Sequence, residues 1–248
     1  MTKLKNFSRS CNILDKILYF WSQNCIVMKK VYVVLAVLLG TVALLLGLLL
    51  IRESSYSRKC DGLDVSHYQD AKTVQGKIDS EDLQFIIAKA TEGKSFRDKT
   101  FERHKRIARE HNLKFGAYHF LTMETPPKEQ FEHFKNVVGR DIDIIPCLDV
   151  EAYYAEPGSK ERQCWPRKQA REFVKEWSQL CKDYYGHYPI IYCTDWYRAT
   201  RFYDMPNKFW IANKYIRPVF DCVIHQYSHN NDTIDFNHLP SGIDDILL

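Results

Sequence analysis

The pattern of hydrophobic and polar positions divides the chain into two parts. Residues 31–51 form a run of 21 residues without a charged side chain, VYVVLAVLLGTVALLLGLLLI. As a helix this run would be about 31 Å long, which is enough to cross the hydrocarbon core of a membrane. From residue 60 onward, short apolar runs alternate with helical and polar segments. The sequence therefore predicts one transmembrane helix followed by a folded domain.

Eight short runs in the second part are apolar and rich in β-branched and aromatic residues, which is typical of strands. They are GLDVS (62–66), FIIAKAT (85–91), KFGAYHFL (114–121), DIDIIPCLDV (141–150), PIIYC (189–193), KFWIANK (208–214), CVIHQYS (222–228) and TIDFN (233–237). Helical patterns cover about 98–111, 126–138 and 166–185, and no helix is expected after about residue 187.

Alternating strands and helices indicate parallel βαβ units. We therefore expect an α/β fold, a barrel whose last third has lost its helices. A doubly wound open sheet is the alternative, but the chain has no Gly-rich phosphate loop to support it.

The net charge of +4 comes from the N-terminal segment. Nine of the 35 basic residues and two of the 31 acidic residues precede residue 60, so residues 60–248 carry a net charge of −3. A slightly acidic domain without a basic stripe is not typical of nucleic-acid binding, and we expect no nucleic-acid partner.

The basic residues also predict the topology. More positive charge precedes the apolar run than follows it, which by the positive-inside rule places the N-terminus in the cytoplasm. We divide the chain into a cytoplasmic segment 1–30, a signal anchor 31–51, a linker 52–59 and an exported domain 60–248. A cleaved signal peptide is the alternative, although no small-x-small cleavage site is evident. Met28 could also be the true start, because two lysines and the apolar run follow it directly.

Six of the eight cysteines lie in the exported domain: Cys60, Cys147, Cys164, Cys181, Cys193 and Cys222. An even number in an exported domain permits up to three disulfides. In the competing interpretation, Cys147, Cys193 and Cys222 are small buried side chains within apolar strands. No cysteine or histidine spacing is typical of a zinc site, so we expect no metal and no cofactor.

Acidic residues lie near several predicted strand ends. Asp149 and Glu151 follow an apolar run in the stretch PCLDVE, and Asp64 and Asp235 lie in GLDVS and TIDFN. Residues two apart on a strand share a face, so Asp149 and Glu151 would point to the same side. Catalytic groups of parallel barrels lie at the carboxyl ends of the strands, and paired carboxylates are what glycosidic bond cleavage requires. An Asp at a strand end can equally be the N-cap of the next helix.

Seven blocks in order resemble the family 25 glycoside hydrolases, which are lysozymes (N-acetylmuramidases): GLDVSHYQ, FIIAKATEG, FGAYHF, IIPCLDVE, IIYC, FWIANKY and HQYS…IDFN. The resemblance covers residues 61 to about 240. It implies a modified TIM-like (β/α)5(β)3 barrel that hydrolyses the β-1,4 bond between N-acetylmuramic acid and N-acetylglucosamine in peptidoglycan. It also implies that Glu151 is the general acid, that Asp149 supports the substrate acetamido group or the charged intermediate, and that Asp64 and Asp235 complete an acidic cleft.

Further positions in these blocks are candidates for substrate contacts: Tyr118, Tyr192, Trp210, Gln226, Tyr227 and Lys89. The aromatic rings could equally be core. Lys89 and Glu92 could lie in the cleft or form a structural ion pair, which we prefer for Glu92. We interpret His119 and His225 as structural. The block that often begins Trp-Gln-Tyr in the family begins with His225 here, and we expect this change to reshape one wall of the cleft.

Two other functions compete with a membrane-anchored muramidase that faces the cell wall. The first is a glycan-binding barrel without turnover, which the complete set of four acids disfavours. The second is a metal-dependent hydrolase built on Asp64, His67 and His119, whose spacing matches no standard ligand motif.

Overall fold

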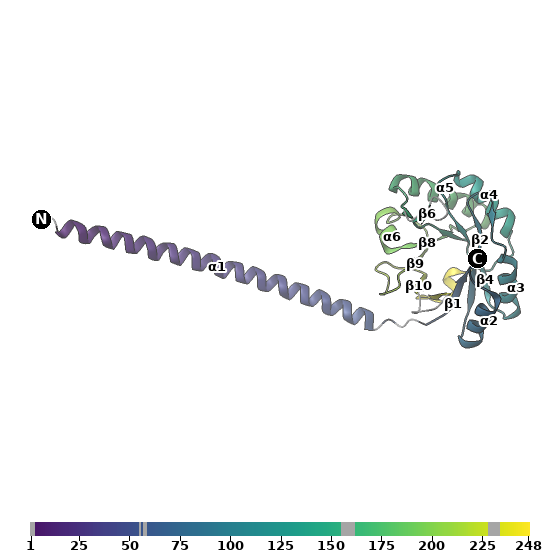
Figure 1. Cartoon of the computed structure of the whole chain (residues 1–248), viewed down its shortest axis with the longest axis horizontal. Coiled ribbons are helices and arrows are strands. Elements are labelled where there is room, and N and C mark those ends of the chain that lie inside the picture. The colour runs from purple at the N-terminus through teal and green to yellow at the C-terminus, as the bar shows by residue number, and fades with distance from the viewer. Residues whose placement is uncertain (1–2, 55, 57–58, 155–161, 228–233) are drawn as a thin grey trace. The chain divides into compact units, whose positions relative to one another are not determined.

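The computed structural model describes residues 3–248 except 55, 57–58, 155–161 and 228–233 (Figure 1). The chain divides into two compact units, Met1–Ser57 and Arg58–Leu248. The linker predicted at 52–59 therefore lies partly outside the described residues.

The first unit is one continuous helix, α1 (Lys3–Ser54). It contains no proline, so nothing in the backbone ends it between the polar N-terminal segment and the apolar run. Its section Lys30–Glu53 is long and apolar enough to cross a membrane, and no part of the described chain covers it. This section includes the predicted span 31–51.

The second unit is built on an eight-stranded barrel in which each strand pairs with its neighbours in the order β1-β2-β4-β5-β8-β9-β10-β11. The strands are β1 (Gly62–Val65), β2 (Phe85–Glu92), β4 (Lys114–Phe120), β5 (Cys147–Asp149), β8 (Ile190–Thr194), β9 (Phe209–Ala212), β10 (Ile224–Tyr227) and β11 (Asp235–His238). All neighbours are parallel except β11, which runs antiparallel to both β10 and β1 and closes the ring. Outside the barrel, β3 (Phe96–Arg97) pairs with β2, and β6 (Tyr153–Tyr154) pairs with β7 (Arg162–Gln163).

Five strands are each followed by a helix, and three further strands complete the barrel, so the predicted (β/α)5(β)3 architecture is confirmed. The helices are α2 (Ala71–Ser80), α3 (Phe101–Glu110), α4 (Pro127–Val138), α5 (Arg167–Tyr185) and α6 (Asp195–Arg201), and a 3-10 turn, η1 (Ile243–Ile246), lies near the C-terminus.

Two helices were not predicted, and one of them corrects the expectation that helices end near residue 187. Only Val74 of α2 is fully buried, so its apolar stripe is too narrow to be recognised. The short helix α6 is capped by Thr194, whose hydroxyl accepts a hydrogen bond from the Tyr197 N–H, and of its residues only Tyr197 is buried. Both helices depend on an N-cap and on the strand that precedes them rather than on a hydrophobic pattern.

The strand predicted at 141–150 is much shorter in the structure, where β5 covers three residues. Pro146 has no N–H to offer a neighbouring strand. Before it, the Asp143 carboxylate accepts a hydrogen bond from the Phe115 N–H, and Ile144 forms an isolated bridge with Leu247.

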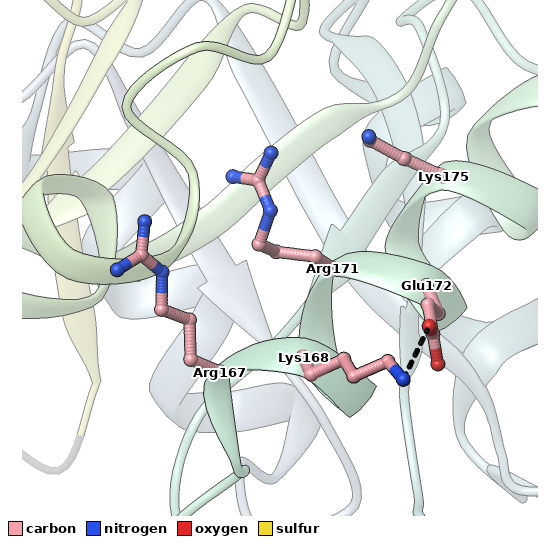
Figure 2. Close-up of a pocket in the computed structure, with 5 residues that line it drawn as sticks. All are labelled: Arg167, Lys168, Arg171, Glu172 and Lys175. Carbon is pink, nitrogen blue, oxygen red and sulfur yellow. Dashed lines mark ion pairs between the residues drawn. The ribbon is translucent and has the colours of Figure 1, made fainter.

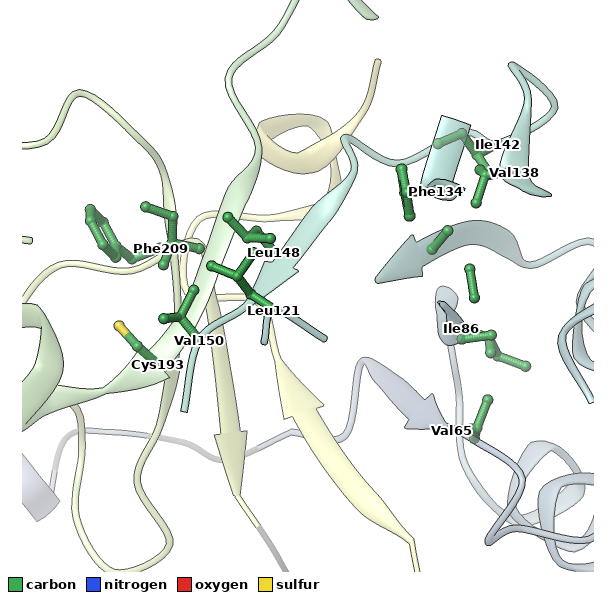
Figure 3. Close-up of a cluster of buried hydrophobic side chains, with 14 of the residues drawn as sticks. Val65, Ile86, Leu121, Phe134, Val138, Ile142, Leu148, Val150, Cys193 and Phe209 are labelled. Atoms are coloured by element: carbon green, nitrogen blue, oxygen red, sulfur yellow. The ribbon is translucent and has the colours of Figure 1, made fainter. Parts of the chain in front are cut away.

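Two hydrophobic cores follow from the alternation of side chains along the strands. The outward-facing side chains form a layer with the surrounding helices, in which Leu148 of β5 and Ile86 of β2 take part (Figure 3). The inward-facing side chains fill the barrel itself: Phe85, Ile87, Cys147, Ile190, Trp210 and Ile224.

The six cysteines of the second unit are all free thiols. Cys60, Cys147, Cys181 and Cys193 are buried among apolar side chains. The interpretation of Cys147 and Cys193 as small buried side chains is therefore confirmed, and the structure contains none of the permitted disulfides among the six.

Candidate active site at the carboxyl ends of the barrel strands

The register of the barrel brings polar residues from many strands to one end. In β1 and β11, Asp64 is the direct partner of Asp235. In β5 and β8, Asp149 is the partner of Tyr192. Asp235 begins its strand, whereas Asp64 and Asp149 lie at or near the ends of theirs. Asp235 joins Asp64 and Asp149 at this end of the barrel only because β11 runs antiparallel to its neighbours. The inward positions at this end are Asp64, Lys89, Tyr118, Asp149, Tyr192, Gln226 and Asp235.

A chain of hydrogen bonds fixes Asp64. Its carboxylate accepts hydrogen bonds from Gln226 Nε2 at 3.1 and 3.0 Å and from Asn237 Nδ2 at 2.8 Å. The Tyr192 hydroxyl donates to Gln226 Oε1 at 2.8 Å, and Trp210 Nε1 donates to Asn237 Oδ1 at 2.8 Å. These contacts hold Asp64 in one orientation at the mouth of the barrel.

Asn237 is the site residue that sequence reasoning missed. It lies two positions after Asp235 on β11 and directly opposite Gly62. The alternation along a strand places Asn237 and Asp235 on the same inward face. The period of two that singled out Asp149 and Glu151 would also have found Asn237 had it been applied to this strand.

Asp64 and Asp149, the acids at the ends of β1 and β5, are both difficult to ionise. Burial and, to a smaller extent, the charge of Asp235 raise the pKa of Asp64 to about 7, against the opposing effect of the hydrogen bonds from Gln226 and Asn237. Burial raises the pKa of Asp149 well above its usual range, Glu151 adds to the increase, and Lys89 partly offsets it. Pairs of acids that oppose each other's ionisation are typical of sites that hold a proton for catalysis.

Asp149 and Glu151 differ in environment. Asp149 is only 7% exposed, and its Oδ1 atom is buried without a hydrogen-bond partner in the described part of the chain. Glu151 lies two residues farther along, beyond the end of β5, and is half-buried. A buried acceptor without a partner is costly for a folded protein, and it is an atom that a ligand N–H could satisfy.

The three inward aromatic residues form the base of the site. The Trp210 ring lies 4.8 Å from the Tyr192 ring and 6.5 Å from the Tyr118 ring, in edge-to-face arrangements. Trp210 is only 2% exposed and belongs to the barrel core, so its ring face is covered. Tyr118 and Tyr192 keep part of their surface accessible.

Lys89 is buried beside the acids and is held in place by its neighbours. Its Nζ lies 2.6 Å from Glu92 Oε2 and 4.8 Å from the centre of the Phe120 ring. The predicted ion pair of Glu92 is therefore confirmed. Because Lys89 opposes the pKa increase of Asp149, its positive charge acts on the acids as well as on Glu92.

Residues next to Gln226 face away from the site. Gln226 points inward, so its neighbours His225 and Tyr227 point outward. His225 is buried and its Nε2 lies 2.8 Å from the Asn213 carbonyl oxygen, and Tyr227 packs in the outer core against Phe236. The structure does not bring Tyr227 to the acids. His225 does not itself face them, and its effect on a cleft wall stays a prediction.

His119 is structural, as predicted. It lies on the outer face of β4, where its ring nitrogens lie 2.8 Å from Thr91 Oγ1 and 3.1 Å from Gln130 Oε1. Burial lowers its pKa to about 3. His67 contacts Asp98 at 2.9 Å rather than Asp64. The set required by a metal-dependent hydrolase is therefore not assembled.

Comparison with known proteins agrees with this geometry. The sequence profile described as glycosyl hydrolases family 25 matches residues 63–236. The Escherichia coli K12 protein YegX is 28% identical over 202 residues, which cover 75% of this chain and 71% of YegX. The solved bacterial lysozyme of Streptomyces coelicolor superposes with a TM-score of 0.64 at 21% identity, covering 77% of this chain and 96% of the lysozyme. A family 25 glycosyl hydrolase of Bacillus anthracis superposes with a TM-score of 0.61 at 24% identity, covering 74% and 90% of the two chains. The fold, the acidic end of the barrel and the match over most of the chain show that this protein belongs to family 25 of the glycosyl hydrolases.

Proposed function

We propose that this glycoside hydrolase is a muramidase that cleaves the β-1,4 bond between N-acetylmuramic acid and N-acetylglucosamine in peptidoglycan. The observation that carries the proposal is the set of four acids, Asp64, Asp149, Glu151 and Asp235, at the carboxyl end of the barrel. Two of these acids are difficult to ionise, which suits a site that must deliver a proton.

Glu151 acts as the general acid in this proposal. It is less buried than Asp149 and lies beyond the strand end, where a glycan chain crossing the barrel mouth would meet it. Its proton passes to the glycosidic oxygen as the bond to the sugar carbon breaks. Glu151 then takes a proton from the water that hydrolyses the intermediate, which restores its starting state.

Asp149 supports a substrate-assisted route. The acetamido oxygen of the substrate attacks the sugar carbon as the leaving oxygen departs, and the N–H of that acetamido group becomes more acidic as positive charge develops. The buried Asp149 Oδ1, which has no hydrogen-bond partner among the residues that the structure describes, would accept this N–H. Asp64 and Asp235 line the same mouth, and the Tyr118 and Tyr192 side chains and the Gln226 amide would contact the sugars.

The test is mass spectrometry of the products that the purified protein releases from peptidoglycan. Reducing-end N-acetylmuramic acid supports the proposal, and reducing-end N-acetylglucosamine would make the enzyme a glucosaminidase. Glu151→Gln should abolish release while the melting temperature stays unchanged, and Glu172→Gln on the exposed surface of α5 is the matched control. Retained activity in Glu151→Gln would contradict the role of Glu151. Binding without products from the unaltered protein would indicate a non-catalytic glycan-binding barrel.

We also propose that α1 anchors the enzyme in a membrane, with the N-terminus in the cytoplasm and the barrel on the cell-wall side. The apolar section Lys30–Glu53 and the basic residues that precede it support this topology. The test is the mass of the mature protein together with its digestion by protease added to intact spheroplasts. An intact N-terminus and a digested barrel are expected. A shortened N-terminus that lacks residues 31–51 would identify a cleaved signal peptide.

A further inference from the structure

Exposed apolar side chains gather on one side of the barrel mouth. They are Trp196 on α6 and Tyr215, Ile216, Val219 and Phe220 between β9 and β10, and we call them the apolar rim. Trp196 is 68% exposed and Tyr215 is 80% exposed. Both segments follow the carboxyl ends of their strands, so the apolar rim lies at the same end of the barrel as the acids.

The apolar rim is held in shape by hydrogen bonds. The Asp195 carboxylate accepts hydrogen bonds from Asn213 Nδ2 at 2.8 Å and from the Val219 N–H at 2.9 Å. Asn213 Oδ1 in turn accepts from the Tyr215 and Ile216 N–H groups at 3.2 and 3.3 Å. A loop ordered in this way presents its apolar side chains without a further loss of conformational freedom when they are covered.

A basic hollow adjoins this region. Arg167, Lys168, Arg171, Glu172 and Lys175 of α5 line a hollow of about 410 Å³ (Figure 2), although residues 60–248 are acidic overall. Asp204 holds Arg171 through contacts of 2.7 and 2.9 Å. Glu172 forms an exposed ion pair with Lys168 at 3.9 Å (Figure 2), so the four cations of the hollow still outnumber these two acids.

Hydrogen bonds connect the hollow to helix α6, next to the apolar rim. Arg167 Nη2 donates to the Tyr203 hydroxyl at 3.3 Å, and Arg171 Nη1 donates to the Arg201 carbonyl oxygen at 2.7 Å. Arg201 ends α6, the helix that carries Trp196 and begins at Asp195. The hollow thus contacts the C-terminal end of α6 and the apolar rim lies at its N-terminal end, so α6 links the two parts of this surface.

We propose that this surface docks on an anionic phospholipid membrane. Trp and Tyr side chains favour the interface between headgroups and acyl chains, and basic residues are attracted to anionic headgroups. A glycan could stack on Trp196 and Tyr215, but it would gain little from Ile216, Val219 and the neighbouring cations. The candidate span in α1 is an independent reason to expect a bilayer near the barrel, and a tether favours even a weak contact.

The test measures binding of residues 59–248 to vesicles of phosphatidylcholine with or without one quarter phosphatidylglycerol. This fragment is a compact unit that contains both hydrophobic cores, and solved relatives consist of little more than the matching region. We expect binding that requires phosphatidylglycerol and weakens as salt is added. The triple variant Tyr215→Ser/Ile216→Ser/Val219→Ser should bind at least tenfold more weakly.

A matched pair of charge variants tests the hollow. Lys168→Gln/Lys175→Gln should weaken binding about tenfold or more, since each basic residue near an anionic surface contributes about fivefold. Lys114→Gln/Lys182→Gln removes the same charge at the start of β4 and near the end of α5, at the opposite end of the barrel, and should have little effect.

Three results would overturn the proposal: no binding to anionic vesicles, equal losses in both charge variants, or a rim variant that loses peptidoglycan binding while vesicle binding is unchanged. Should the triple variant melt at a lower temperature, quenching by brominated lipids provides a second measurement. Tryptophan fluorescence is measured for the unaltered full-length protein and for Trp196→Phe, both in liposomes. The difference in quenching between them reports Trp196 alone. The absence of a difference would also overturn the proposal.

Discussion

The raised pKa of Asp64 predicts that the barrel becomes less stable as the pH rises through neutrality. The pKa increases from 3.8, the ordinary value of the group, to about 7 in the folded protein. Because the folded state holds this proton more tightly than the unfolded state, the contribution of Asp64 to the free energy of unfolding falls from about pH 4 upward and levels off above pH 7. The difference between 3.8 and about 7 corresponds to about 4 kcal/mol in the free energy of unfolding. This is an upper figure, since Asp64 is half-buried and retains some contact with water.

The assay is urea unfolding of residues 59–248 at several values between pH 4.5 and pH 8.5, with Asp64→Asn beside the unaltered fragment. The variant cannot ionise at this position, so the decrease in stability with pH should be smaller by up to about 4 kcal/mol. The pH dependence is the quantity to compare, because Asn also changes the contacts with Gln226 and Asn237 and so shifts stability at every pH. Asp79→Asn on the exposed surface of α2 is the control. The same pH dependence in Asp64→Asn and the unaltered fragment would refute the reasoning.

Three further predictions concern the stability of the same fragment. Gly62→Ala should destabilise the fragment by about 1–3 kcal/mol, because a Cβ atom there would lie 2.4 Å from the Phe85 ring. A Cβ atom at Gly76 in α2 meets nothing within 4 Å, so Gly76→Ala should stabilise it by about 0.5–1 kcal/mol. Urea unfolding that ranks the two variants the other way would contradict the packing. Asn237→Ala should lower the free energy of unfolding by about 1–3 kcal/mol, because it leaves the buried Trp210 Nε1 without its acceptor. Urea unfolding measures this loss, and a loss below about 0.5 kcal/mol would argue against that hydrogen bond. A reducing agent should leave the melting temperature unchanged, since the six cysteines are free, and a clear decrease would reveal a disulfide.

Substitutions inside the barrel and substitutions at its mouth should differ in their effect on stability. Asn237 donates a hydrogen bond to Asp64 and accepts one from Trp210, and both Asn237 and Trp210 are buried inside the barrel. Their loss is expected to change activity through the orientation of Asp64 and stability through packing. Variants at the mouth, such as Glu151→Gln, change a side chain that is less buried and lies beyond the end of β5, and they separate catalysis from folding more cleanly.

The sequence by itself determined the features that depend on local periodicity. An uncharged run of 21 residues can bury its side chains only as a membrane helix or a core helix, and the apolar run that ends at Asp149 and Glu151 predicted acids at the end of a strand. Alternating strand and helix patterns indicated the barrel, and the ordered blocks indicated its family. The helices at 126–138 and 166–185 were found because each has a broad apolar stripe.

The tertiary structure decided what depends on pairing between distant segments. Asp235 reaches the acids only because β11 is antiparallel and in register with β1, and no local pattern specifies either property. Because the Gln226 side chain points into the barrel, the side chains of Tyr227 and His225 point to its outer side. The short helices α2 and α6 form where the preceding strand and a capping side chain place them. The pKa values of Asp64 and Asp149 depend on burial and on neighbours from other strands, because an electric charge responds to its surroundings in space rather than to its position in the sequence.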